Sequence, residues 1–196
     1  MLPQTTVREL TWRETETLYR TQMPLDFPPQ EIKPLAMLRS LSTRGLNKTF
    51  VLSQNETLLA YAMFELPSEG QVWLLDYLAV VREARGLGIG GDFLHRFPAL
   101  ARDADAILAE IEHPARAESP AEREKRERRK RFYLKNGLIE TDVCTRADGG
   151  VDYEILCLPL HRALRGQEAA DAMERLYKTF FSPRTYEVFP PCPALL

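Results

Sequence analysis

The sequence lacks several features that would indicate a membrane-bound or secreted protein. No apolar run approaches about 18 residues, the length that a helix needs to cross a membrane. The N-terminal segment MLPQTTVRELTWRE has neither the basic start nor the apolar stretch of a signal peptide. The full sequence of 196 residues is 44% hydrophobic and 28% charged, which is ordinary for a globular protein. We therefore expect a cytoplasmic protein that does not bind membranes.

Cysteine and histidine are also scarce, with three residues of each. Cys144, Cys157 and Cys192 form an odd number without a C-x-x-C pair, which is typical of a protein from a reducing compartment. The three histidines are scattered and do not have the spacing of zinc ligands. The sequence therefore predicts no metal site.

An excess of positive charge is missing too, because the net charge is −2. This value argues against a general nucleic-acid-binding protein. The exception is residues 121–135, where eight Lys or Arg accompany three Glu and give a local charge of +5. Pairs spaced by four residues, such as Glu124 with Arg128, favour a solvated helix face. The alternative is a helix that attracts an anionic ligand.

Hydrophobic periodicity predicts an α+β protein with a mixed sheet. We expect strands at 7–10, 49–53, 57–65, 71–81, 106–112, 141–146 and 153–158. We expect helices through 18–19, ended by Pro24, and at 31–41, 88–97, 121–135 and 167–181, with a loop at 25–29. Turn residues at 54–56 and 147–150 predict two hairpins. Residues 1–165 then form one domain, on which a C-terminal helix and a Pro-rich tail (166–196) pack.

A glycine-rich segment follows the buried strand at 71–81, and residues 85–91 of it are called the glycine loop below. It contains four glycines within six residues, next to Arg82 and Arg85. Glycine lets backbone N–H groups approach a ligand closely, and a helix start adds unpaired donors and a positive dipole end. The segment therefore predicts an anion site, most simply for a pyrophosphate.

The spacing Gly86-x-Gly88-x-x-Gly91 also matches a dinucleotide fingerprint, with Glu110 or Glu112 about 20 residues further on. In that fold, however, the first glycine directly follows the strand. Here polar residues 82–85 intervene, and no second βαβ unit follows. These departures disfavour a nicotinamide or flavin dinucleotide site.

A second match is more specific. The run Arg85-Gly86-Leu87-Gly88-Ile89-Gly90 resembles the (Gln/Arg)-x-x-Gly-x-(Gly/Ala) signature of the GCN5-related N-acetyltransferase (GNAT) family. Residues 78–80 resemble that family's fourth strand. Residues 131–138, RFYLKNGL, resemble its FYxKNGF motif, with Leu138 where Phe is commoner. The resemblance covers about residues 5–160.

The resemblance implies a GNAT-like acyl-CoA N-acyltransferase fold and acetyl-coenzyme A as co-substrate. It implies that one strand backbone N–H polarises the thioester carbonyl. The implied coenzyme-binding residues are Leu78, Ala79, Val80, Arg85, Gly86, Leu87, Gly88, Ile89, Gly90, Gly91 and Asn136. Asn136 has an alternative role at the helix C-terminus.

Catalysis of acetyl transfer to an amine needs an acid and a base. Tyr133 matches the family's acid for the departing thiolate; the alternative is an aromatic ring that packs on the sheet. For the base we expect Glu112, then Glu110, then Asp76, because carboxylates in apolar strands are rare without a purpose. The alternative for each is a carboxylate paired with an arginine.

The expected function is transfer of an acetyl group from acetyl-CoA to a primary amine by direct attack in a ternary complex. The acceptor is a small molecule or a peptide that the sequence does not identify, and the protein is a monomer or homodimer. The alternative function is a non-catalytic sensor or scaffold that binds acetyl-CoA. Release of coenzyme A in the presence of amines distinguishes the two.

Overall fold

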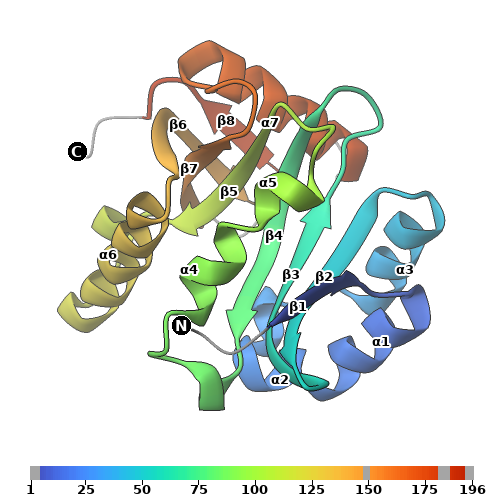
Figure 1. Cartoon of the computed structure of the whole chain (residues 1–196). Helices are drawn as coiled ribbons and strands as arrows, with labels where there is room; N and C mark the ends of the chain where they lie inside the picture. The colour runs from blue at the N-terminus through green and yellow to red at the C-terminus, as the bar shows by residue number, and fades with distance from the viewer. Residues whose placement is uncertain (1–4, 148–150, 181–185, 193–196) are drawn as a thin grey trace. The chain divides into compact units, whose positions relative to one another are not determined.

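The structure is a computed structural model that describes residues 5–147, 151–180 and 186–192 (Figure 1). Its strands are β1 (Thr6–Glu9), β2 (Asn47–Gln54), β3 (Thr57–Glu65), β4 (Val72–Val80), β5 (Ala106–Glu112), β6 (Ile139–Ala147), β7 (Asp152–Pro159) and β8 (Tyr186–Phe189). Its α-helices are α1 (Trp12–Thr21), α2 (Met23–Asp26), α3 (Leu35–Thr43), α4 (Ile89–Leu94), α5 (Phe97–Leu100), α6 (Pro120–Lys135) and α7 (Gly166–Phe180). The expected α+β class is confirmed.

The chain divides into two compact units. The first comprises residues up to 66 together with 75–97, and the second comprises 67–74 and the residues from 98 onward. Within the first unit the strand order is β1-β2-β3-β4. Within the second unit it is β4-β5-β7-β6-β8, because residues 72–74 of β4 belong there.

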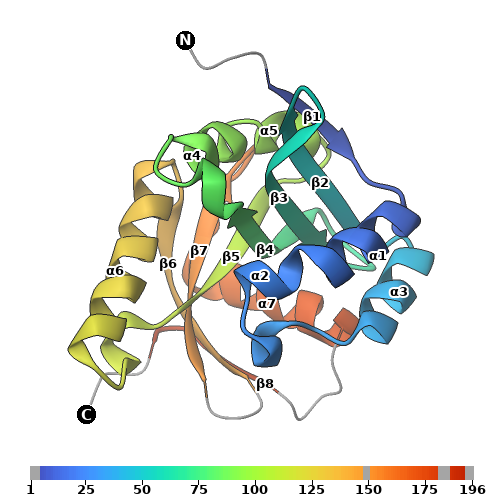
Figure 2. The ribbon, with the colours of Figure 1, turned by 90° about the horizontal axis from the view of Figure 1, so that it is seen from below.

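In the first unit, β1, β2 and β3 form antiparallel neighbours. The turn between β2 and β3 has positive φ at both Asn55 (47°) and Glu56 (65°), as a two-residue hairpin of this kind requires. The helices α1, α2 and α3 cover one face and α4 the other (Figure 2). The first face buries a cluster made of Leu18, Met23, Leu38, Val51, Tyr61, Met63, Tyr77 and Ala79.

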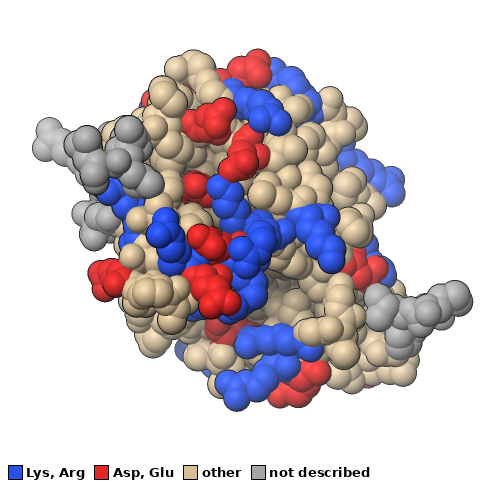
Figure 3. Space-filling view, turned by 90° about the vertical axis from the view of Figure 1, so that its left-hand side faces the viewer, with Lys and Arg blue, Asp and Glu red and all other residues tan. Residues whose placement is uncertain are grey.

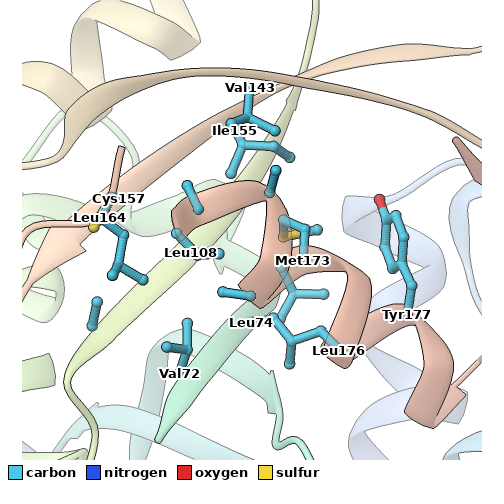
Figure 4. Close-up of a cluster of buried hydrophobic side chains, with 14 residues drawn as sticks. Val72, Leu74, Leu108, Val143, Ile155, Cys157, Leu164, Met173, Leu176 and Tyr177 are labelled. Atoms are coloured by element: carbon cyan, nitrogen blue, oxygen red, sulfur yellow. The ribbon is translucent and has the colours of Figure 1, made fainter. Parts of the chain in front are cut away.

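In the second unit, β5 pairs with β7, β7 with β6, and β6 with β8, all antiparallel. The helix α7 is amphipathic and places Ala169, Met173, Leu176 and Tyr177 on one stripe. Figure 4 shows this stripe facing side chains of the strands, including Leu108 of β5. The buried stripe explains why the C-terminal helix is part of the fold.

Proline positions account for the main errors in the first unit. Pro24 does not end the first helix; α1 ends at Thr21, and Pro24 lies in the first turn of α2, where its missing N–H costs nothing. The expected loop at 25–29 is therefore wrong for residues 25 and 26. The helix expected from residue 31 begins only at Leu35, because Pro34 disfavours helical backbone in the residue before it. Near Pro98, the expected helix 88–97 is divided into α4 and α5.

The C-terminal tail contains a strand that the sequence did not predict. The strand β8 pairs with β6, and a disulfide joins Cys144 of β6 to Cys192, with the two Cα atoms 4.9 Å apart. The third cysteine, Cys157, is buried and unbonded. Residues 148–150 of the expected second turn and Phe181 of the expected last helix lie outside the described residues.

Candidate functional site

The glycine loop connects β4 to α4 through a short 3-10 turn over Arg82–Ala84. Two of its residues, Gly86 (φ 80°) and Gly88 (φ 78°), have left-handed backbone. A Cβ at either position would meet no atom within 4 Å, so it is the backbone conformation that requires glycine there. The conformation turns the chain sharply enough for α4 to begin at Ile89.

The loop presents a row of unused backbone donors. Within the described chain, no acceptor lies in hydrogen-bonding geometry to the N–H groups of residues 86–91. No side chain caps the start of α4 either, since its N-cap is Gly88. Residues 86–88 are exposed, with Leu87 at 62%, whereas Ile89 and Gly90 are buried, so the row is open to solvent at its start. Successive free N–H groups favour an anion, and a pyrophosphate is long enough to use several of them.

The strand before the loop ends in Leu78, Ala79 and Val80. Ala79 is buried in the first-unit cluster. The Val80 carbonyl accepts a hydrogen bond of 2.9 Å from Nε of Arg85. The predicted coenzyme-binding residues 78–80 and 85–91 thus all lie in the first unit.

Asp76 of β4 is held in a buried ion cluster. Nζ of Lys33 lies 2.8 Å from Oδ1 of Asp76 and 2.5 Å from Oε1 of Glu65, whose side chain is fully buried. Burial alone lowers the pKa of Lys33, but the charges of Asp76 and Glu65 outweigh it and leave this pKa well above its ordinary value. Oδ2 of Asp76 is buried and, among the described residues, has no hydrogen-bond partner.

The partner of Asp76 is therefore a lysine and not an arginine. Sequence reasoning missed both Lys33 and Glu65. The sequence offered one sign of this cluster, the carboxylate of Glu65 at the end of a mostly apolar strand. Nothing in the sequence singled out Lys33.

The other two candidate bases lie in the second unit and also have partners. Oε1 of Glu110 accepts hydrogen bonds from the hydroxyl groups of Thr145 and Tyr177. The Glu112 carboxylate accepts hydrogen bonds from two arginines of α6, from Nη2 of Arg126 at 3.1 Å and from Nη1 of Arg129 at 3.2 Å. The expected alternative, pairing with arginine, thus describes Glu112, whereas Thr145 and Tyr177 contact Glu110 through hydroxyl groups.

Tyr133 lies near the end of α6 and is 9% exposed. Its ring contacts Phe132 edge-on at a centroid distance of 5.3 Å. Burial raises the pKa of Tyr133 to about 12, although the Arg129 charge opposes the shift. No hydrogen bond to its hydroxyl group is present among the described residues. The group is therefore a protonated phenol whose proton is not already donated within the described chain.

Asn136 follows α6 directly. Its side-chain amide donates to the Phe132 carbonyl at 2.8 Å, and its backbone N–H donates to the Tyr133 carbonyl at 3.0 Å. Gly137 comes next with φ 96°, as is common after a helix end. In this structure the Asn136 amide therefore serves the helix C-terminus.

The basic segment is confirmed as a helix. Lysine and arginine side chains gather on the face shown in Figure 3, interspersed with acidic side chains. Arg128 and Arg131 of α6 each lie 3.6 Å from the glutamate four residues earlier. Arg126 is 9% exposed and binds Glu112 of β5 as well as Glu122, the glutamate four residues earlier.

The described residues contain neither a membrane-spanning helix nor a cluster of metal ligands. None of their helices is both long and apolar enough to pass through a membrane. No three of their His, Cys, Asp or Glu side chains are grouped so that they could hold a metal ion.

Comparison with known proteins identifies the family. The model of the acetyltransferase (GNAT) family matches residues 7–137, more than half of the chain. No curated protein sequence matches.

Solved structures share the fold. A GNAT-family protein from Bacteroides thetaiotaomicron is 17% identical with a TM-score of 0.68, over 88% of this chain and 96% of that one. The ribosomal-protein-S18-alanine N-acetyltransferase from Escherichia coli is 18% identical with a TM-score of 0.59, over 82% and 96% of the two chains. A GNAT-family acetyltransferase from Elizabethkingia anophelis, solved with acetyl-CoA bound, is 15% identical with a TM-score of 0.55, over 80% and 98%. Because the family model matches residues 7–137, this chain belongs to the GNAT family of N-acetyltransferases, which use acetyl-coenzyme A.

Proposed function

We propose that the protein transfers the acetyl group of acetyl-CoA to a primary amine by direct attack in a ternary complex. The observation that carries the proposal is the row of six backbone N–H groups, residues 86–91, without acceptors in the described chain. Such a row fits the pyrophosphate of the coenzyme, which supplies the reactive thioester. The strand residues 78–80 supply the backbone N–H that polarises the thioester carbonyl.

Tyr133 is the proposed acid for the departing thiolate. With a pKa of about 12 it stays protonated at neutral pH, and its hydroxyl has no other partner among the described residues. A coenzyme thiol has a pKa near 8.5, so transfer from a phenol is uphill and depends on good positioning.

The proposed base is Glu112, because its side chain is 25% exposed, against 11% for Asp76. Asp76 is the second choice, because one of its oxygens makes no hydrogen bond in the described chain. Glu110 is third, because two hydroxyl groups already donate to one of its oxygens.

Binding is tested by calorimetry with acetyl-CoA on Gly88→Glu. This substitution places a carboxylate at a left-handed position among the loop donors, so we expect binding to be abolished while circular dichroism is unchanged. Glu83→Gln, in the preceding turn, is the matched control and keeps its affinity. Unchanged affinity of Gly88→Glu would show that the glycine loop is not the coenzyme site.

Chemistry is tested with an accepted amine found by screening for coenzyme A release. Tyr133→Phe keeps the ring, so we expect kcat to fall about 10²-fold with little change in coenzyme affinity. The rates of Glu112→Gln, Glu110→Gln and Asp76→Asn are compared as a function of pH. The carboxylate that serves as base is identified by the variant in which the low-pH limb of the rate profile changes. If none of the four variants affects the rate, positioning alone supplies catalysis.

A sensor without turnover is the second candidate. It is favoured by the observation that all three carboxylates already have partners inside the protein. Tight binding of acetyl-CoA, without release of coenzyme A above hydrolysis for any amine in a broad panel, would support the sensor over the enzyme.

A further inference from the structure

A buried carboxylate lies next to the glycine loop within the first unit. Asp26, the last residue of α2, has a side chain that is only 2% exposed. Its Oδ2 accepts hydrogen bonds from Gln22 at 2.9 Å and from the Tyr61 hydroxyl at 3.1 Å. Its Oδ1 accepts from Nη2 of Arg85 at 2.7 Å. Three donors from separate parts of the chain thus fix this carboxylate in place.

Arg85 uses its guanidinium for two different contacts. Besides Nη2, which donates to Asp26, its Nε donates to the Val80 carbonyl at 2.9 Å. The residue directly precedes Gly86, the first of the unused loop donors. The guanidinium therefore joins the end of β4, the buried Asp26 and the start of the glycine loop.

The stretch between β4 and α4 is anchored at both ends: the Val81 N–H donates to the Leu59 carbonyl at 2.9 Å, and Ala84 and Ile89 are buried. Between these anchors, the side chains of Arg82, Glu83, Arg85 and Leu87 are exposed. The backbone contacts between residues 81 and 85 are short-range turn bonds, Ala84 N–H to the Val81 carbonyl and Arg85 N–H to the Arg82 carbonyl. Among the exposed side chains, that of Arg85 ties the start of the glycine loop to the end of β4 and to Asp26.

We propose that Asp26 is a positioning residue for the coenzyme: through Arg85 it holds the glycine loop in its binding geometry before the ligand arrives. A loop held in place loses less conformational entropy on binding, so affinity rises without any contact between Asp26 and the ligand. This proposal rests on the proposed function of the loop.

Electrostatics alone makes the opposite prediction. The coenzyme is strongly anionic, so removing a carboxylate beside its site would strengthen binding, most of all at low salt. A positioning role predicts weaker binding from the same substitution. The sign of the affinity change therefore separates the two explanations.

The experiment is calorimetry with coenzyme A on wild type, Asp26→Asn, Arg85→Lys and the double variant. We expect each single variant to weaken binding about fivefold, the scale of one partly exposed ion pair. The double variant should bind about as weakly as either single one, because both break the same link. Arg85→Lys keeps the charge but cannot contact Asp26 and Val80 with a planar fork.

Glu16→Gln breaks the exposed Arg20–Glu16 pair of α1 in the same unit and is the matched control, expected to leave affinity unchanged. If Asp26→Asn does not fold, Tyr61→Phe decides, because it removes the 3.1 Å hydrogen bond to Oδ2 of Asp26 without changing a residue of the glycine loop. Equal or tighter binding by the folded variants overturns the positioning role. Absence of binding by the wild type would instead overturn the proposed function.

Discussion

Tyr133 combines deep burial with a hydroxyl that has no protein acceptor in the described chain. Its pKa is raised to about 12, above the ordinary value of 10.0, because burial disfavours the phenolate. Folded protein therefore keeps this proton between pH 10 and 12, whereas unfolded protein releases it. The contribution of Tyr133 to stability is complete below about pH 10 and is lost as the pH rises toward 12.

We predict that Tyr133→Phe loses less stability than the wild type between pH 8 and 11. The difference should approach about 1 kcal/mol at pH 11, since each pH unit between the two pKa values is worth roughly 1.4 kcal/mol. Urea unfolding at both pH values measures it. Parallel losses in the two proteins would mean that Tyr133 has an ordinary pKa.

Single residues also show where sequence reasoning succeeds and fails. The glycines at 86 and 88 were recognisable because left-handed backbone demands that residue type. Asp76 was recognisable as a carboxylate that needs a partner. Its partner Lys33 was not, because the contact joins residues 43 positions apart and depends on the fold.

At the scale of elements, Lys33 holds the segment between α2 and α3 to β3 and β4. Its Nζ contacts Glu65 and Asp76, and its backbone N–H donates to the Tyr77 hydroxyl at 2.8 Å. Removing the ammonium group of Lys33 leaves the buried carboxylates of Glu65 and Asp76 without the positive charge that lies between them. We predict that Lys33→Met lowers the free energy of unfolding by about 3–5 kcal/mol.

Urea unfolding of Lys33→Met, with Lys48→Met as a control at a 36% exposed side chain, measures this effect. Adding Asp76→Asn to Lys33→Met should restore part of the loss, because one buried charge disappears. An equal loss in both lysine variants would contradict the buried-cluster explanation.

The disulfide between β6 and the residues that follow β8 gives a second prediction for elements. The disulfide Cys144–Cys192 closes a chain segment with a sequence separation of 48. Such a link restricts the unfolded chain, so reduction should lower the free energy of unfolding by about 2–4 kcal/mol. Equilibrium unfolding with and without a reductant tests this. The Cys144→Ser, Cys192→Ser double variant should not respond to the reductant, and a response there would assign the effect elsewhere.

Most elements followed from periodicity and turn residues, and β5 (Ala106–Glu112) has the expected bounds. The strand β8 did not follow, because its four residues, directly followed by Pro190, carry too short a pattern to indicate a strand. Its existence depends on the neighbouring edge of β6. The disulfide was missed for the same reason, since only β8 brings Cys192 near Cys144.

At the scale of the whole molecule, ligand-induced stabilisation separates the two nucleotide interpretations of the glycine loop. Coenzyme A at 100 times its Kd should stabilise the folded protein by about 2.7 kcal/mol. We predict a clear rise in Tm with coenzyme A and none with NAD, since polar residues 82–85 separate β4 from the first glycine. A larger shift with NAD would favour an oxidoreductase site.

The disulfide also determines how the whole chain bears a stretching force. Tension applied after residue 196 would reach Cys192 and pass through sulfur directly to Cys144 in β6. The residues between the two cysteines, which include β7, α7 and β8, then carry no load and add nothing to the contour length. In an optical trap, the fully unfolded chain should therefore be shorter by roughly 160 Å when oxidised than when reduced.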